Sequence, residues 1–113
     1  KGISGYAQMQ PPTKSYQEQV FYHTLRGDDD GNTSVAMINA ELEIGLSIHF
    51  NKRQFSRFTQ WKQMGKGEYV MGMEPCISYI QPFEKKEFNV VISLHYGVKQ
   101  LKMLEDTVNN YLK

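Results

Sequence analysis

Short segments in which apolar and polar residues alternate recur along this chain, and they constrain its fold more than any other feature. The clearest segment is 44–51, where isoleucine, leucine and phenylalanine side chains alternate with glycine, serine, histidine and asparagine. A second alternation runs through 87–96. Successive side chains of a strand point to opposite faces of its sheet, so both segments are predicted to be strands. For 44–51 we expect one face in a core and the other in water.

The other predicted elements complete a β fold with one helix. Four shorter runs rich in β-branched and aromatic residues predict strands at 20–25, 34–39, 58–64 and 68–74. After Gly97 the apolar residues recur every three or four positions, which predicts a helix over 98–112. Strands that follow one another through tight turns favour an antiparallel sandwich over a parallel sheet. We therefore expect a mainly antiparallel all-β fold: an extended arm over 1–19, then a β-sandwich over 20–113 that ends in the helix.

The composition is that of one globular domain and argues against several functions. The 113 residues are 40% hydrophobic and 22% charged, which supports one core. The net charge is +1 with scattered lysines and arginines, so we expect no nucleic-acid partner. No apolar run approaches the ~20 residues that cross a bilayer, so we expect no membrane association. The single cysteine, Cys76, excludes an internal disulfide and, beside six methionines, favours a cytoplasmic location.

Residues 58–75, FTQWKQMGKGEYVMGMEP, concentrate the side chains that a binding site needs. They are predicted to form two strands joined by a turn at 65–67. They include the chain's only tryptophan together with glutamates, glutamines and lysines. Amides and carboxylates bond sugar hydroxyls, and an indole can cover the apolar C–H face of a sugar ring. We therefore predict that this hairpin binds a sugar.

Two residues of the hairpin have both a functional and a structural interpretation. Glu74 lies at a strand end, two residues after Gly72, whose missing side chain leaves space for a ligand. Its functional interpretation is catalytic, as a general base that takes a proton from a hydroxyl; its structural interpretation, which the spacing alone favours, is a surface glutamate. Trp61 is either the sugar platform or a core residue.

Three further residues are predicted to bind the substrate. Gln60 and Lys62 share one strand face, whereas Trp61 points to the other if the strand is regular. Lys62 could neutralise a developing negative charge, or it could be an ordinary solvated lysine. His23, between apolar neighbours, is the best histidine for acid–base work, although such a histidine is more often structural.

No metal and no cofactor are expected. The acidic run that starts at Asp28 invites a calcium interpretation, but its twelfth position, where a calcium loop needs a glutamate, is Asn39. We predict a solvated turn there instead. The sequence contains neither a glycine-rich phosphate loop nor a zinc-type cluster of cysteine and histidine.

The hairpin, together with the preceding segment VFYHTLRGDDDGNTSVAMINAELEIGLSIHF (20–50), resembles the C-terminal half of the aldose-1-epimerase-like proteins of the galactose-mutarotase-like superfamily, in a mostly uncharacterised branch. The string QWK…GEYV.G.EP carries the resemblance. It implies a large antiparallel β-supersandwich with a sugar in an open cleft. In the catalytic members a glutamate takes the proton of the anomeric hydroxyl and a histidine protonates the ring oxygen. Glu74 falls where that glutamate lies, and Gln60 falls near a sugar-contacting glutamine.

The resemblance also sets expectations about partners. Family members are considerably longer, and the half that carries the acid histidine has no counterpart here; His23 matches no family acid. Between Pro75 and Pro82 the chain is shorter than the family loop. Exposed sheet edges need covering, so we expect the missing N-terminal half, another protein chain or a second copy to cover them. Three functions stay open: a sugar isomerase, a non-catalytic carbohydrate-binding domain, and a structural sandwich that assembles with another chain.

Overall fold

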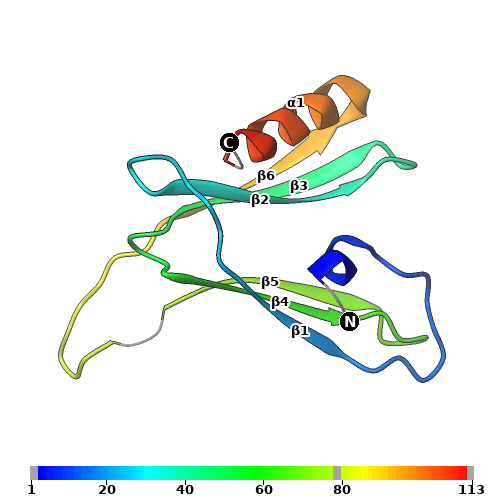
Figure 1. The fold of residues 1–113 in the computed structure, drawn as a ribbon, viewed down its shortest axis with the longest axis horizontal. Helices are drawn as coiled ribbons and strands as arrows, with labels where there is room; N and C mark the ends of the chain where they lie inside the picture. Colours follow the sequence, from blue (N-terminus) through cyan, green and yellow to red (C-terminus); the bar gives the residue numbers. More distant parts are fainter. Residues whose placement is uncertain (1–2, 78–79, 112–113) are drawn as a thin grey trace. The chain divides into compact units, whose positions relative to one another are not determined.

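The computed structural model describes residues 3–77 and 80–111, which form two three-stranded antiparallel sheets, one 3-10 helix and one α-helix (Figure 1). In chain order the elements are η1 (Ile3–Ala7), β1 (Gln19–His23), β2 (Asn32–Asn39), β3 (Ile44–Asn51), β4 (Arg57–Gln63), β5 (Val70–Cys76), β6 (Val90–Tyr96) and α1 (Gly97–Asn110). The predicted fold class, mainly antiparallel β with a C-terminal helix, is confirmed. The helix predicted over 98–112 begins at Gly97 and ends at Asn110; position 112 lies outside the described residues.

The chain divides into two compact units, each built around one sheet. The first unit consists of Lys1–Thr24 and Arg57–Cys76 and contains the sheet β1-β4-β5. The second unit consists of Leu25–Ser56 and Ile77–Lys113 and contains the sheet β2-β3-β6 with helix α1. The hairpin 58–75 therefore lies wholly in the first unit, and the acidic turn at Asp28 lies in the second.

In the first unit β4 is the central strand, and the N-terminal segment lies on its sheet. Both neighbours of β4 pair with it in antiparallel register. Thr13 adds an isolated bridge to Gly65: its N–H donates to the Met64 carbonyl at 2.9 Å, and its own carbonyl accepts from the Lys66 N–H at 3.1 Å. Within the segment predicted as an extended arm, Ile3–Ala7 instead forms a 3-10 helix over one sheet face (Figure 1).

In the second unit helix α1 covers the sheet face that was predicted to be wet. Gly45 and Ser47 of β3 are buried, and a Cβ built on Gly45 would lie 2.8 Å from Leu101 and 3.2 Å from Leu104. The expectation of an open face was wrong because glycine and serine mark a close helix approach here. Small side chains let the two buried leucines of α1 come close to the strand backbone.

The chain passes from β6 into α1 without a loop, and glycine makes this turn. Gly97 has φ of +85°, which a residue without Cβ adopts at little cost. Its N–H donates to the carbonyl of Glu43 at 2.8 Å, and the Tyr96 N–H donates to Oε1 of Gln100 at 2.7 Å. Two backbone donors at the start of the helix are therefore satisfied.

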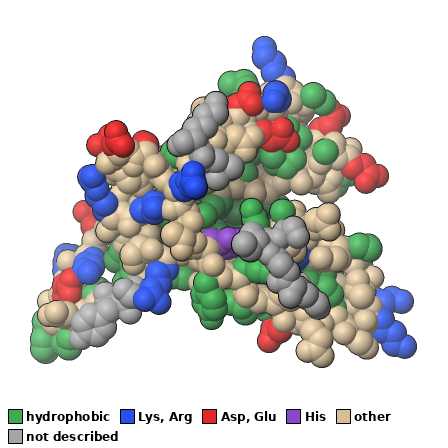
Figure 2. Space-filling view, viewed as in Figure 1, with side chains coloured by type: hydrophobic (Ala, Val, Ile, Leu, Met, Phe, Trp, Pro, Cys, Tyr) green, Lys and Arg blue, Asp and Glu red, His purple; other side chains and the backbone are tan. Residues whose placement is uncertain are grey.

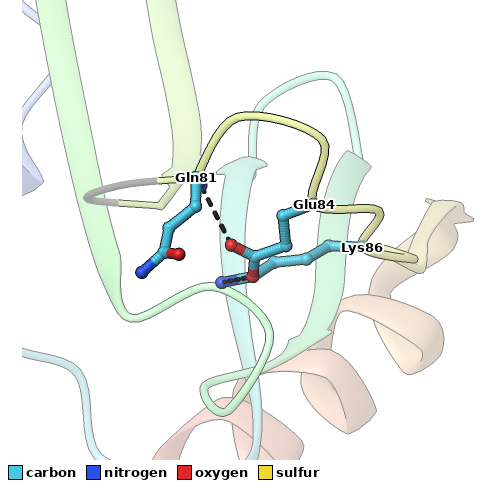
Figure 3. A network of polar contacts seen from close by, with 3 residues as sticks. All are labelled: Gln81, Glu84 and Lys86. Carbon is cyan, nitrogen blue, oxygen red and sulfur yellow. Dashed lines mark hydrogen bonds and ion pairs between the residues drawn. The ribbon is translucent and has the colours of Figure 1, made fainter.

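Two acidic residues form hydrogen bonds that organise turns of the second unit. Asp28 Oδ1 accepts from the Asn32 N–H at 2.8 Å, and this bond is the main cause of its lowered pKa. Glu84 accepts from the Gln81 N–H at 2.9 Å and pairs with Lys86 at 3.1 Å (Figure 3); the first contact contributes most to lowering the pKa of Glu84. Across residues 3–77 and 80–111, no three His, Cys, Asp or Glu side chains are placed to hold a metal ion.

Charged side chains of both signs are interspersed on the face of the molecule that Figure 2 shows, as the net charge of +1 suggests. In the part of the chain that the structure describes, no helix has the length and apolar character that crossing a membrane requires.

The packing of α1 on the second sheet leads to a stability prediction. Leu104 is 4% exposed against Gly45, whereas Met103, its neighbour, is 61% exposed. Leu104→Ala should lower the free energy of unfolding by roughly 2–5 kcal/mol, because it removes buried methyl groups and leaves a cavity. Met103→Ala is the matched control and should change it by less than about 0.5 kcal/mol. Urea unfolding followed by circular dichroism measures both, and equal losses would contradict this packing.

Candidate functional site

Strand β4 separates the five predicted site residues onto the two faces of its sheet. Gln60 and Lys62 point to one face, and Phe21 and Met73 across the register point the same way. The alternate residues of β4, Thr59 and Trp61, point to the other face. Glu74 opposes Thr59 directly, so the predicted base shares a face with Trp61 and not with Gln60 and Lys62. His23 opposes Phe58 and therefore lies on the Gln60 face.

Lys62 is buried beneath the N-terminal segment. Its side chain is 0% exposed, and its Nζ donates to the backbone carbonyls of Gly5, at 2.9 Å, and of Gln8. Burial lowers the pKa of this ammonium below its ordinary value, because removal from water disfavours the charged form. The lysine is thus a structural anchor for the segment that contains η1, and it is not the solvated lysine that the sequence also allowed.

Gln60 and His23 are joined to the same segment by hydrogen bonds whose direction can be assigned. Gln60 Nε2 donates to the Tyr6 carbonyl at 3.0 Å, and a carbonyl can only accept. Gln60 Oε1 must therefore face His23 Nε2, 2.9 Å away, and this ring nitrogen must carry the proton. The His23 ring also lies 4.8 Å, centroid to centroid, from the ring of Tyr6 in an edge-to-face arrangement. Both side chains are engaged inside the protein.

The opposite face presents the catalytic candidate beside the tryptophan. Trp61 opposes Gly72 in the register, and a Cβ built on Gly72 would lie 2.7 Å from Glu74 Oε2 and 3.5 Å from Trp61 Cβ. The Glu74 carboxylate thus lies over the bare backbone of Gly72, so the space that the sequence predicted beside Gly72 is occupied by Glu74 itself. Glu74 is exposed, and the ion pairs found among the described residues do not include it. Tyr22, which opposes Thr59 on this face, is 84% exposed.

A further carboxylate belongs to this face, and the sequence analysis missed it. Glu18 Oε2 accepts a hydrogen bond from Trp61 Nε1 at 2.8 Å. Glu18 lies two residues before Val20, the partner of Trp61 in the register. Parity alone would place Glu18 beside Trp61, but only once the pairing of β1 with β4 is known, and no local pattern contains that pairing.

The structure therefore brings Glu74 and Trp61 together and separates them from the other three predicted residues. We call the face formed by Glu18, Tyr22, Thr59, Trp61, Gly72 and Glu74 the Trp61 face. It combines carboxylates, a hydroxyl and aromatic rings, which is chemistry suited to a neutral polyol with apolar C–H faces. The substrate-binding roles of His23, Gln60 and Lys62 stay predictions; they would require the N-terminal segment to leave the sheet.

Comparison with known proteins identifies the fold and then the family. A solved structure described as a putative aldose 1-epimerase from Klebsiella pneumoniae subsp. pneumoniae MGH 78578 is similar to this chain with a TM-score of 0.86 and 27% sequence identity. The similarity covers 97% of this chain and 34% of that one, so the chain spans about a third of the length of the protein that it matches. The fold is thus aldose-1-epimerase-like, of the galactose-mutarotase type, as the resemblance implied.

The chain belongs to the family described as Domain of unknown function (DUF4432), which matches residues 1–110. No curated protein matches the sequence. The family and the fold are therefore established, whereas the activity is a matter for proposal.

The buried ammonium of Lys62 should make stability depend on pH in a defined direction. Between its lowered folded pKa and the ordinary value of 10.5, the unfolded chain binds more protons than the folded chain. The desolvation penalty is therefore fully present below that window and is relieved as the pH rises through it. The free energy of unfolding of the wild type should rise with pH relative to that of Lys62→Met, which has no ammonium.

Urea unfolding from neutral pH to about 10 measures this difference. Lys66→Met is the matched control, because Lys66 is exposed in the neighbouring turn and its difference from wild type should stay constant. A constant difference for Lys62→Met as well would show that its ammonium is not desolvated.

Proposed function

We propose that this chain binds an aldose on the Trp61 face and contributes the general base of a sugar 1-epimerase. The observation that carries the proposal is the Glu74 carboxylate, which is exposed, outside the ion pairs of the described residues, and placed over Gly72 next to Trp61. The similarity to a structure described as a putative aldose 1-epimerase supports the same assignment.

In the proposed reaction Glu74 accepts the proton of the anomeric hydroxyl. The C1–O5 bond then breaks, a carbonyl forms at C1, and the ring oxygen receives a proton from a general acid. Rotation about C1–C2 and reclosure give the other anomer and return both protons. An anomeric hydroxyl is more acidic than an ordinary alcohol, so a carboxylate is a sufficient base. The acid must come from another part of the site, because His23 lies on the opposite face of the sheet.

A non-catalytic carbohydrate-binding domain is the alternative within this proposal. The same face would then hold the sugar through the indole and the hydrogen-bonding groups around Gly72. The two versions differ in whether the proton of the anomeric hydroxyl is transferred, and therefore in the effect of removing the Glu74 carboxylate.

We also propose that further polypeptide covers strand β6. β6 is an edge strand of the second sheet, and the side chains of Ile92, Leu94 and Tyr96 on one of its faces are exposed. An exposed apolar edge strand is a template for pairing with another strand. The similar solved structure is about three times as long as the part that this chain matches, which favours additional chain of the same kind as the cover. A second copy of the chain is the other occupant to test.

The catalytic part of the proposal predicts a loss of anomer exchange in Glu74→Gln. Loss of a general base should lower the rate about 10²–10⁴-fold, because the amide cannot take the proton. The rate is measured by polarimetry of freshly dissolved D-glucose and D-galactose. The assay uses the longest form of the protein that can be expressed. Glu68→Gln, an exposed carboxylate of the same hairpin, is the control and should keep the wild-type rate.

Equal rates for wild type and Glu74→Gln would remove Glu74 from the mechanism. Sugar binding by both forms with exchange by neither would establish the non-catalytic alternative instead.

The proposal for β6 predicts self-association of the 113-residue chain when it is alone. Ile92→Ser with Leu94→Ser should lower the sedimentation coefficient toward that of a monomer, because the apolar row that seeks a partner is gone. Met103→Ser, which removes an exposed apolar side chain from α1, should not. A monomeric wild-type chain at all concentrations would count against an unsatisfied edge at β6.

A further inference from the structure

The hydrogen bond between Glu18 and Trp61 fixes the edge of the only tryptophan in the chain. An indole has a single donor, Nε1–H, and here that donor is satisfied by Glu18 Oε2 at 2.8 Å. A hydrogen bond to a carboxylate is roughly twice as strong as one between neutral groups. This hydrogen bond restricts rotation of the indole about its covalent bond to Cβ. The hydrogen bond is made at the edge of the ring and does not occupy either ring face.

The neighbours of Trp61 define where a ligand would lie. Glu74 follows two residues after Gly72, the register partner of Trp61, so Trp61 and Glu74 are diagonal neighbours across β4 and β5. Such positions lie about 7–8 Å apart between backbones, within reach of long side chains. Gly72 between them contributes no side chain, and a Cβ there would meet Glu74 Oε2 at 2.7 Å. The Glu74 carboxylate therefore lies over the backbone of Gly72, next to Trp61, and a sugar ring stacked on the indole would have its edge at this carboxylate.

We infer that Glu18 is a positioning residue that holds Trp61 as the stacking platform of a pyranose whose anomeric hydroxyl meets Glu74. The inference rests on the proposed function of the Trp61 face and adds the geometry of its subsite. The pyranose places an apolar C–H face on the indole and its reducing end at the carboxylate. Glu18 touches no reacting atom in this arrangement; it acts through the orientation of the indole.

A positioning role has a distinct kinetic consequence. A platform that binds substrate and transition state equally affects KM and leaves kcat unchanged. Loss of Glu18 should therefore raise KM, whereas loss of the Glu74 carboxylate should lower kcat. A preorganised ring also loses less freedom on binding, so releasing it weakens sugar binding.

The experiment compares Glu18→Ala with Glu18→Gln, using the fluorescence of Trp61 as the reporter. D-glucose and D-galactose are titrated into each protein, and the dissociation constant is taken from the emission change. Glu18→Ala should weaken binding about tenfold and lower the fluorescence anisotropy of the free protein, because the ring gains motion. Glu18→Gln retains an acceptor oxygen and should restore binding to within about threefold of wild type.

Two controls keep a folding defect from imitating the expected result. Glu68→Ala removes a carboxylate of the same unit that is not bonded to the indole, and it should bind like wild type. Urea unfolding midpoints identify any variant whose loss of binding comes from a loss of structure. Where anomer exchange is measurable, Glu18→Ala should raise KM about tenfold at unchanged kcat.

The outcomes separate this inference from the function on which it rests. If wild type binds sugar and Glu18→Ala binds equally well, the positioning role is overturned and the proposed function stands. If Glu18→Ala and Glu18→Gln lose binding alike while remaining folded, the acceptor role is overturned. If no sugar changes the Trp61 emission of wild type, the carbohydrate platform is overturned together with the inference.

Discussion

The register of β4 between β1 and β5 determines the chemistry of the first unit. Because side chains alternate along a strand, one register sends Gln60 and Lys62 to the buried face and Thr59 and Trp61 to the other. A shift of one residue would exchange the two sets. It would carry the Lys62 ammonium away from the carbonyls that bind it and would place the indole under the N-terminal segment. The buried lysine and the presented tryptophan are therefore two consequences of the same pairing.

The N-terminal segment and Lys62 depend on each other. A lysine removed from water needs acceptors, and the carbonyls of Gly5 and Gln8 supply them. Those carbonyls belong to a segment with a short 3-10 helix, which packs on the sheet through such contacts. Gln60 adds a bond to the Tyr6 carbonyl and holds His23 in turn. The polar groups of this face thus bind the backbone of the segment, whereas the opposite face presents Trp61 and Glu74.

Periodicity predicted the elements well, because a period of two or of three to four residues is a local property. The strand at 44–51 and the C-terminal helix were both found in this way. We did not predict that α1 covers the face with Gly45. In a sequence, glycine and serine suggest a solvent-exposed face, and only the packed helix shows that they are buried. The pairing of Glu18 with Trp61 joins residues 43 positions apart and could not be predicted from local sequence.

The same distinction explains what was predicted of the site. That Trp61 points away from Gln60 and Lys62 follows from the parity of one strand. That Glu74 joins Trp61 rather than those two residues requires the pairing of two strands, and the turn between them leaves that register open. The absence of a side chain at Gly72 is also required by the position of Glu74, because a side chain at Gly72 would displace the Glu74 carboxylate. The position of the Glu74 carboxylate next to Trp61 thus depends on a missing side chain, and this carboxylate has no partner in the ion pairs of the described residues. A strand residue that is neither packed nor paired contributes little to stability, so its effect is best sought in what it can bind.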